Sequence, residues 1–224
     1  MKATKVVIVG IIVFALVSTV GIGMGSQRTT VSGGKIPALA FHDNWLHLWE
    51  DHVTWTRLVI IGVLDGTPAG ALDEYETRLL QNYEDMEEAL EPFYGEARSH
   101  AFGDLIEEHL GIAVLILQDL KNGTDPTADL DAWYANAGEL ADMMNQLNPT
   151  YWPDDMANKM WDDHLDATAA EAVAHFSHDW KADTEAYNVV VELSIEMANF
   201  VSNGLILQFR SMFNGSDIAM RPNI

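Results

Sequence analysis

The chain of 224 residues contains no cysteine. This absence excludes disulfide bonds, thiolate metal sites, covalent haem attachment and a lipid anchor on cysteine. Any metal ion would have to be held by histidine, aspartate, glutamate, asparagine or backbone oxygen atoms.

Basic residues are also scarce, because 12 lysines and arginines face 34 aspartates and glutamates, which gives a net charge of −22. Such a surface repels nucleic acid phosphates and anionic lipid headgroups, which argues against either as a partner. It suits a salty medium or cationic partners, and it equally suits a surface that is simply well solvated.

Several catalytic and cofactor motifs are missing from the chain. It has no Glu-x-x-His, so the ferritin-like di-iron signature is absent. It also has no His-Glu-x-x-His, Walker A, Gly-x-Gly-x-x-Gly or Gly-x-Ser-x-Gly motif. No nucleophile or general-base constellation stands out, so the sequence gives no ground for assigning an enzyme activity.

Residues 1–25 carry two early lysines and then an uncharged, mostly apolar run long enough to cross a bilayer. They are predicted to be a signal anchor or a signal peptide. The Gly23-Met24-Gly25 segment differs from the Ala-x-Ala type that favours cleavage, so an uncleaved anchor is favoured over secretion. The lysines then lie in the cytoplasm and the remaining chain lies outside, tethered to the membrane through a flexible linker at 26–40.

Two sequons are consistent with an extracytoplasmic location. Asn122-Gly123-Thr124 and Asn214-Gly215-Ser216 fall where loops are expected, so Asn122 and Asn214 are candidate acceptors for N-linked glycans. Other proteins of the cell envelope are candidate partners of such a tethered domain.

One short pattern occurs three times, as Trp49–Val53, Ile106–Leu110 and Trp161–Leu165. Each copy reads large apolar residue, acid, acid, histidine, aliphatic residue, and each belongs to a segment with helical periodicity. No sustained period-two alternation is present, so no sheet is expected. The sequence predicts an all-α fold in which one antiparallel helical hairpin is repeated three times.

The predicted hairpins span about 41–95, 99–148 and 154–213, which gives about six helices in a single helical-bundle domain at 41–213. Residues 214–224 form a tail. Prolines and glycines mark the ends of most predicted helices, but none marks the third turn near Asp179 to Lys181.

The repeated histidines are the candidate metal ligands. In an antiparallel hairpin, residues at equal distance from the turn face each other, which sets Asn82 and Asp85 near His52. The same reasoning sets Asn136 and Glu139 near His109, and Glu192 and Glu196 near His164. Imidazoles with nearby carboxylates suit zinc, iron, manganese or copper. The predicted metal ligands are His52, His109 and His164, with Asp85 and Glu139 as ligands or as orienting partners.

Glu171 is a further predicted ligand. It stands two helical turns after His164, where the other two repeats have Val59 and Ile116. A carboxylate on an otherwise apolar helix face needs a partner, because burying it alone is costly.

The same pattern has a purely structural interpretation. A buried histidine often donates its ring N–H to a carboxylate and does nothing else. Three such pairs would follow from duplication alone, in a structural or interaction protein of the envelope that binds no metal.

Parts of the chain resemble a family of exported bacterial and archaeal proteins with a Trp-x-x-His-Val-x-Trp-Thr-Arg pattern, here Trp49 to Arg57. The likeness covers most of the chain after residue 40, and is carried by residues 48–57, 79–85, 133–137 and 204–209. The resemblance implies an extracytoplasmic, helical protein and implies no established activity. Some members are labelled glycosyltransferases, which no motif in these residues supports.

Overall fold

The structure, a computed structural model, describes residues 34–214. The predicted anchor at 1–25, most of the linker at 26–40 and the tail from 215 therefore lie outside the described residues. The predicted all-α class is confirmed, because the described chain forms six helices and almost no strand. The helices are α1 (Ala38–Asp65), α2 (Ala69–Tyr94), α3 (Glu96–Asn122), α4 (Thr127–Leu147), α5 (Asp154–Phe176) and α6 (Trp180–Gln208).

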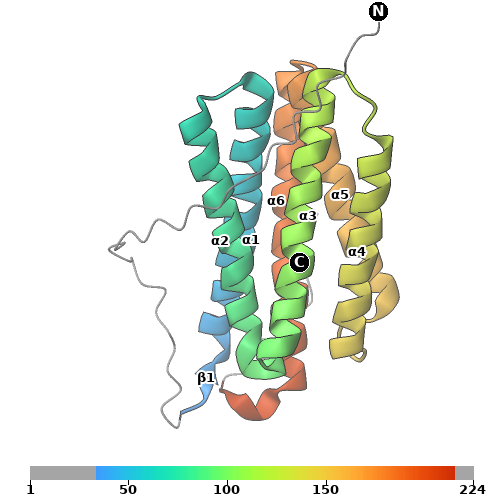
Figure 1. The fold of residues 1–224 in the computed structure, drawn as a ribbon. Helices are drawn as coiled ribbons and strands as arrows, with labels where there is room; N and C mark the ends of the chain where they lie inside the picture. Colours follow the sequence, from blue (N-terminus) through green and yellow to red (C-terminus); the bar gives the residue numbers. More distant parts are fainter. Residues whose placement is uncertain (1–33, 215–224) are drawn as a thin grey trace, which may run out of the picture. The chain divides into compact units, whose positions relative to one another are not determined.

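The six helices form three antiparallel hairpins that lie lengthwise beside one another in one bundle (Figure 1). Each helix packs against the next along the chain, and α6 returns to pack against α1. The first helices of the three hairpins, α1, α3 and α5, also contact one another across the middle of the bundle. Any residue repeated on these three helices is therefore brought toward a common centre.

Local sequence explains where most helices begin and end. Gly66 and Gly123 end α1 and α3 in the left-handed conformation, with φ of 79° and 67°, which glycine adopts without strain. A proline at a helix start loses no intrahelical hydrogen bond, because the first N–H groups have no partner there. Prolines accordingly occupy the N-cap positions of α1, α2, α4 and α5, as Pro37, Pro68, Pro126 and Pro153.

The third turn, which no glycine or proline marks, lies between Phe176 and Trp180. His178 takes the left-handed conformation there, with φ of 58°. The Asp179 side chain accepts a hydrogen bond from the backbone N–H of Ala182 and so caps α6. A polar cap and one strained histidine replace the glycine of the other two hairpins.

The chain departs from the predicted boundaries at both ends of the domain and in the second helix. Residues 36–37 were predicted to belong to a flexible linker, but they form strand β1 (Ile36–Pro37), which pairs in parallel with β2 (Phe213–Asn214). This short pair is a departure from the prediction of no sheet. It forms because the buried Phe213 packs with Ala38 and Ile206 and brings the two ends of the domain together.

Pro92 was predicted to end the second helix, but it lies inside α2, which continues to Tyr94. A proline this close to a helix end removes only one backbone hydrogen bond. The partly buried Phe93 and Tyr94 pack against the core, which offsets that loss.

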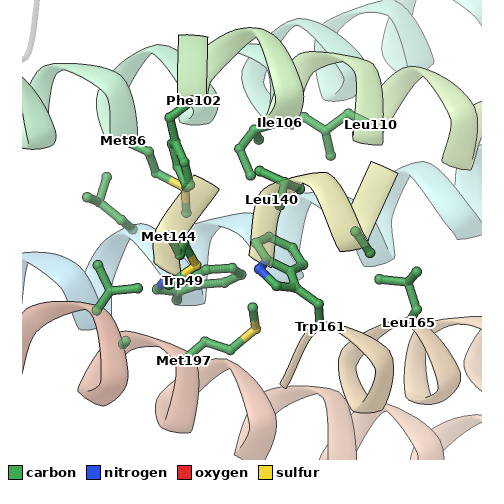
Figure 2. Packing of buried hydrophobic residues seen from close by; sticks show 14 of the residues in the cluster. Trp49, Met86, Phe102, Ile106, Leu110, Leu140, Met144, Trp161, Leu165 and Met197 are labelled. Atoms are coloured by element: carbon green, nitrogen blue, oxygen red, sulfur yellow. The ribbon is translucent and has the colours of Figure 1, made fainter. Parts of the chain in front are cut away.

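The core runs along the centre of the bundle and is rich in aromatic and thioether side chains. Figure 2 shows Trp49 and Trp161 in its middle, with Met144 and Met197 extending toward them from other helices. Both indole rings are almost completely buried. Large rigid rings fill the space between three converging helices, and flexible methionines fill the gaps that remain.

Of the described helices, α6 alone is long and apolar enough to span a membrane by length and composition. Half of its most apolar stretch is buried inside the bundle. A core helix of a globular domain has the same properties, so α6 is explained by its packing against α1 and α5.

Candidate metal centre

The three repeated histidines meet in the middle of the bundle. His52 on α1, His109 on α3 and His164 on α5 are each only 2% exposed. The ring centroid of His164 lies 5.9 Å from that of His52 and 6.4 Å from that of His109. We call these three residues the histidine centre.

The helical register explains why the rings lie at one level. His52 and His109 stand the same number of residues before the capping glycines Gly66 and Gly123, and His164 is one residue closer to its own turn. Because α1, α3 and α5 run in the same direction and contact one another, equal distance from the turn becomes equal depth in the bundle.

Two of the histidines are held by asparagines of the return helix in the same hairpin. His52 Nδ1 lies 3.1 Å from Asn82 Oδ1, and His109 Nδ1 lies 3.0 Å from Asn136 Oδ1. Each asparagine in turn donates its Nδ2–H₂ to a backbone carbonyl, as Asn82 does to Leu48 at 2.9 Å. The Asn136 amide donates likewise, to the Leu105 carbonyl at 3.1 Å.

This arrangement fixes the tautomer of both rings. A backbone carbonyl can only accept, so it takes the amide nitrogen and leaves the amide oxygen facing the imidazole. That oxygen also only accepts, so Nδ1 of His52 and of His109 must carry the proton. The Nε2 atom of each neutral ring is therefore unprotonated and has a free lone pair.

Burial keeps the imidazoles neutral. It lowers the pKa of His52 to about 4, against a smaller opposing effect of the Asn82 hydrogen bond. Burial and the nearby His52 lower the pKa of His109 to about 3. The pKa of His164 falls well below its usual range, because of burial and then of its two histidine neighbours. Metal coordination needs neutral imidazoles, and the site supplies them without competition from protons.

His164 differs from the other two histidines. Its Nδ1 atom is buried and has no hydrogen-bond partner within residues 34–214. Within the described residues, three indole N–H groups packed around the centre are likewise buried without a hydrogen-bond partner. They belong to Trp49, Trp133 and Trp161. Buried polar atoms are normally paired, so a cluster of unpaired ones marks the place where an additional partner would be stabilised.

The rings are not already arranged as a finished metal site. Among residues 34–214, no group of three or more His, Asp or Glu side chains has the spacing needed to hold a metal ion. His164 is the ring that no hydrogen bond holds in place.

Asp85 and Glu139, the two carboxylates predicted to support the histidines, form no hydrogen bond with His52 or His109, whose side-chain partners are Asn82 and Asn136. Asp85 lies near Arg78 and Asp51, where burial raises its pKa and Arg78 opposes the increase. Glu139 is exposed on α4. Their place is taken by Asn82 and Asn136, one turn earlier in each helix. These amides bind the neutral ring without bringing a negative charge into the core.

Glu171 belongs to a separate cluster near the third turn. It is 1% exposed, and its Oε1 accepts a hydrogen bond of 2.6 Å from Arg57 Nη1. Arg57 also binds both carboxylate oxygens of Asp183, at 2.9 and 3.1 Å. The partner that a buried carboxylate requires is therefore Arg57, which follows His52 by five residues on α1.

His175 and Asp65 extend this cluster to the surface. His175 Nδ1 lies 3.2 Å from Asp183 Oδ2, and its Nε2 lies 3.2 Å from Asp65 Oδ1. We call Arg57, Asp65, Glu171, His175 and Asp183 the charged network. It joins α1, α5 and α6 and holds the third hairpin against the first.

The two buried carboxylates of the charged network titrate in opposite directions. Burial raises the pKa of Glu171 to about 7, although its hydrogen bond to Arg57 opposes the increase. For Asp183, burial raises the pKa, but hydrogen bonds from Arg57 and His175 outweigh it and the net pKa is lowered. The Arg57 guanidinium thus stabilises the negative charge of Asp183 more than that of Glu171, with two hydrogen bonds to Asp183 and one to Glu171.

A small internal cavity of about 10 Å³ lies beside the histidine centre. Trp49 and Trp161 line it, and both also pack against His164, with ring centroids 6.1 and 6.2 Å apart. A second hollow, of about 330 Å³, is a surface groove along α5 and α6. Met160 and Phe200 line both, so these two side chains separate the groove from the internal cavity.

Comparison with models of protein families, with curated proteins and with solved structures gives no match to this chain. The histidine centre is therefore interpreted from its own geometry.

Proposed function

We propose that this protein binds a transition metal ion or a small ligand at the histidine centre, as an extracytoplasmic domain tethered to the membrane. His52, His109 and His164 are the proposed ligands. The proximity of three buried neutral imidazoles from three different hairpins, with the His164 ring centroid 5.9 and 6.4 Å from those of His52 and His109, is the observation that carries the proposal.

The hydrogen bonds of Asn82 and Asn136 support this reading. A histidine that binds a metal usually donates its other ring N–H to a carboxylate, carbonyl or water, which fixes the tautomer and the ring orientation. Here two amide oxygens hold the Nδ1–H groups in the same way in two separate repeats. Both Nε2 lone pairs are then free for zinc, iron, manganese or copper.

The proposed location depends on the early lysines and the apolar run within residues 1–25, followed by the linker. Asn122, the last residue of α3, and Asn214 are both exposed, as glycan acceptors must be. Envelope proteins are the proposed neighbours of the tethered domain.

Metal titration of the protein purified without a tag tests the proposal. The metal-free protein should bind close to one ion per chain, and His109→Ala should weaken binding by at least tenfold while the variant stays folded. His47→Ala is the matched control, because His47 is exposed near the start of the same helix as His52. Binding that survives in His52→Ala, His109→Ala and His164→Ala would contradict the proposal.

In the competing proposal, the protein has a structural or interaction role, and its histidines only stabilise the core. The asparagine hydrogen bonds and the dense tryptophan packing favour it, since they stabilise the fold without any ligand. On this account His164→Ala lowers the melting temperature, and adding metal ions does not raise the melting temperature of the original protein.

A further inference from the structure

The cavity beside the histidine centre is lined by three methionines from three different helices. Met144 on α4, Met160 on α5 and Met197 on α6 contribute to its wall. Met144 and Met197 are buried, and Figure 2 shows both directed toward the Trp49 ring from separate helices. We call this space the thioether cavity; Trp45, Trp49 and Trp161 also contribute to its wall.

The thioether cavity is separated from the histidine centre by a single layer of indole rings. Trp49 and Trp161 lie in its wall and pack directly against His164. On the other side, Met160 reaches the surface groove, which Met156 also lines. Methionines thus line both the surface groove and the thioether cavity, and the Trp49 and Trp161 rings lie between the cavity and His164.

We propose that the metal of the histidine centre is copper in its +1 state, and that it reaches the imidazoles through the thioether cavity, where Met144, Met160 and Met197 bind it. This inference depends on the proposed function. It selects copper from the four candidate metals, which are zinc, iron, manganese and copper.

Ligand chemistry supports copper over the other candidates. Thioether sulfur is a soft ligand that selects Cu(I), whereas zinc is held by thiolate, imidazole and carboxylate groups. Imidazole suits copper as well as zinc and iron. Of the four metals, copper is the one that both kinds of side chain at this place would bind.

Charge supports the same choice. The ligands proposed here are neutral imidazoles and thioethers, and the nearest predicted carboxylates, Asp85 and Glu139, do not contact the histidines. A buried ion without a compensating anion loses solvation energy that grows with the square of its charge. A monovalent ion is therefore tolerated far better at this site than a divalent one.

The size of the cavity is also suitable. About 10 Å³ corresponds to space for roughly one water-sized atom, and the wall is almost wholly apolar, so water gains little there. Methionines fill irregular gaps in many cores. The proposal therefore has to be tested by exchanging sulfur for carbon without changing the packing.

Competition against a coloured Cu(I) chelator under anaerobic conditions provides this test. The double variant Met160→Leu with Met197→Leu nearly conserves volume and should remain folded. Its Cu(I) affinity should fall at least tenfold, while its Zn(II) affinity stays within twofold of the original. Met86→Leu is the control, because Met86 is buried like Met197 but lies outside the wall of the thioether cavity.

The outcomes separate this inference from the proposed function. Unchanged Cu(I) affinity in the double variant, together with a loss in His109→Ala, overturns the thioether route and leaves the histidine centre intact. Absence of both Cu(I) and Zn(II) binding in the original protein overturns both proposals. A Zn(II) affinity above that for Cu(I) overturns the choice of metal alone.

Discussion

His164 and His52 lie with their ring centroids 5.9 Å apart, although they belong to different hairpins and are widely separated in the chain. The contact exists because α1 and α5 run side by side with the same direction and register. Repetition of one hairpin thus places a repeated side chain at a shared point. The proposed metal binding depends on this relationship.

The asparagine hydrogen bonds should set both the tautomer and part of the stability. We expect ¹⁵N spectra at neutral pH to show His52 and His109 protonated at Nδ1 and not at Nε2. Asn136→Leu leaves the His109 Nδ1–H without its acceptor and should lower the free energy of unfolding by about 1–3 kcal/mol.

Urea unfolding of the same variant measures that change. Asn158→Ala is the control, because the hydrogen bonds of Asn158 to Asp154 are exposed, and it should change stability by less than about 0.5 kcal/mol. Nε2-protonated rings, or equal stability losses in the two variants, would show that the amides do not orient the histidines.

Removal of Arg57 should be among the most damaging single changes in the third hairpin. Arg57→Leu leaves Glu171 and Asp183 buried without their shared cation, which typically costs about 3–5 kcal/mol. Adding Glu171→Gln should recover part of this loss, because one of the two uncompensated charges is then removed. Chemical denaturation of the single and double variants measures both effects.

Arg78→Leu is the control, because it breaks an ion pair with Asp51 that is partly exposed to solvent. That pair should contribute only about 0–1 kcal/mol. A similar loss from Arg78→Leu and Arg57→Leu would refute the structural importance given to the charged network.

Acid should destabilise the protein through its neutral histidines. The folded-state pKa values of His52 and His109 are lowered to about 4 and 3, so between pH 6.5 and those values the unfolded chain binds protons that the folded chain does not. Stability is then fully present above pH 6.5 and falls as the pH decreases, by up to about 1.4 kcal/mol per pH unit for each histidine.

Urea midpoints from pH 7.5 to pH 4 in the original protein and in His109→Gln test this dependence. The variant should lose less stability across the range, because one of the titrating rings has been removed. His47→Gln, changed at an exposed position, should leave the shape of the curve unaltered. Parallel curves for all three proteins would show that the buried imidazoles are not the cause.

Gly204 should tolerate no side chain. A Cβ atom there would stand 2.0 Å from Nε1 of Trp152, which donates a hydrogen bond to the Phe200 carbonyl. Gly204→Ala should therefore displace this ring and destabilise the protein by about 1–3 kcal/mol. Gly138→Ala, in open space within α4, should instead stabilise by about 0.5–1 kcal/mol. Thermal melts of the two variants that shift in the same direction would contradict this reading.

Helical periodicity and the repeated acid-acid-histidine pattern were enough to predict the hairpins and the meeting of three histidines. They could not predict the partners of those histidines, because Asn82 and Asp85 lie within one turn of each other and register is known only to about one turn from sequence. On the basis of charge alone, the carboxylates Asp85 and Glu139 were predicted to be the partners of the histidines. The buried environment favours the amides, which cost less to desolvate.

For Glu171, the sequence predicted the burial of the side chain, from its place on an apolar helix face, but not its partner. Arg57 comes from another hairpin, and only the packing of α1 against α5 and α6 brings them together. The thioether cavity was missed because methionines at helical spacing look the same in sequence whether they fill a core or line a cavity.

A crystal of the metal-loaded protein, with anomalous diffraction recorded on both sides of the absorption edge of the metal, tests the central claim most directly. The account predicts one strong anomalous peak among His52, His109 and His164, within about 2.0–2.1 Å of their ring nitrogens as for other imidazole ligands. A map with no peak there, from protein that has taken up the metal in solution, would contradict it.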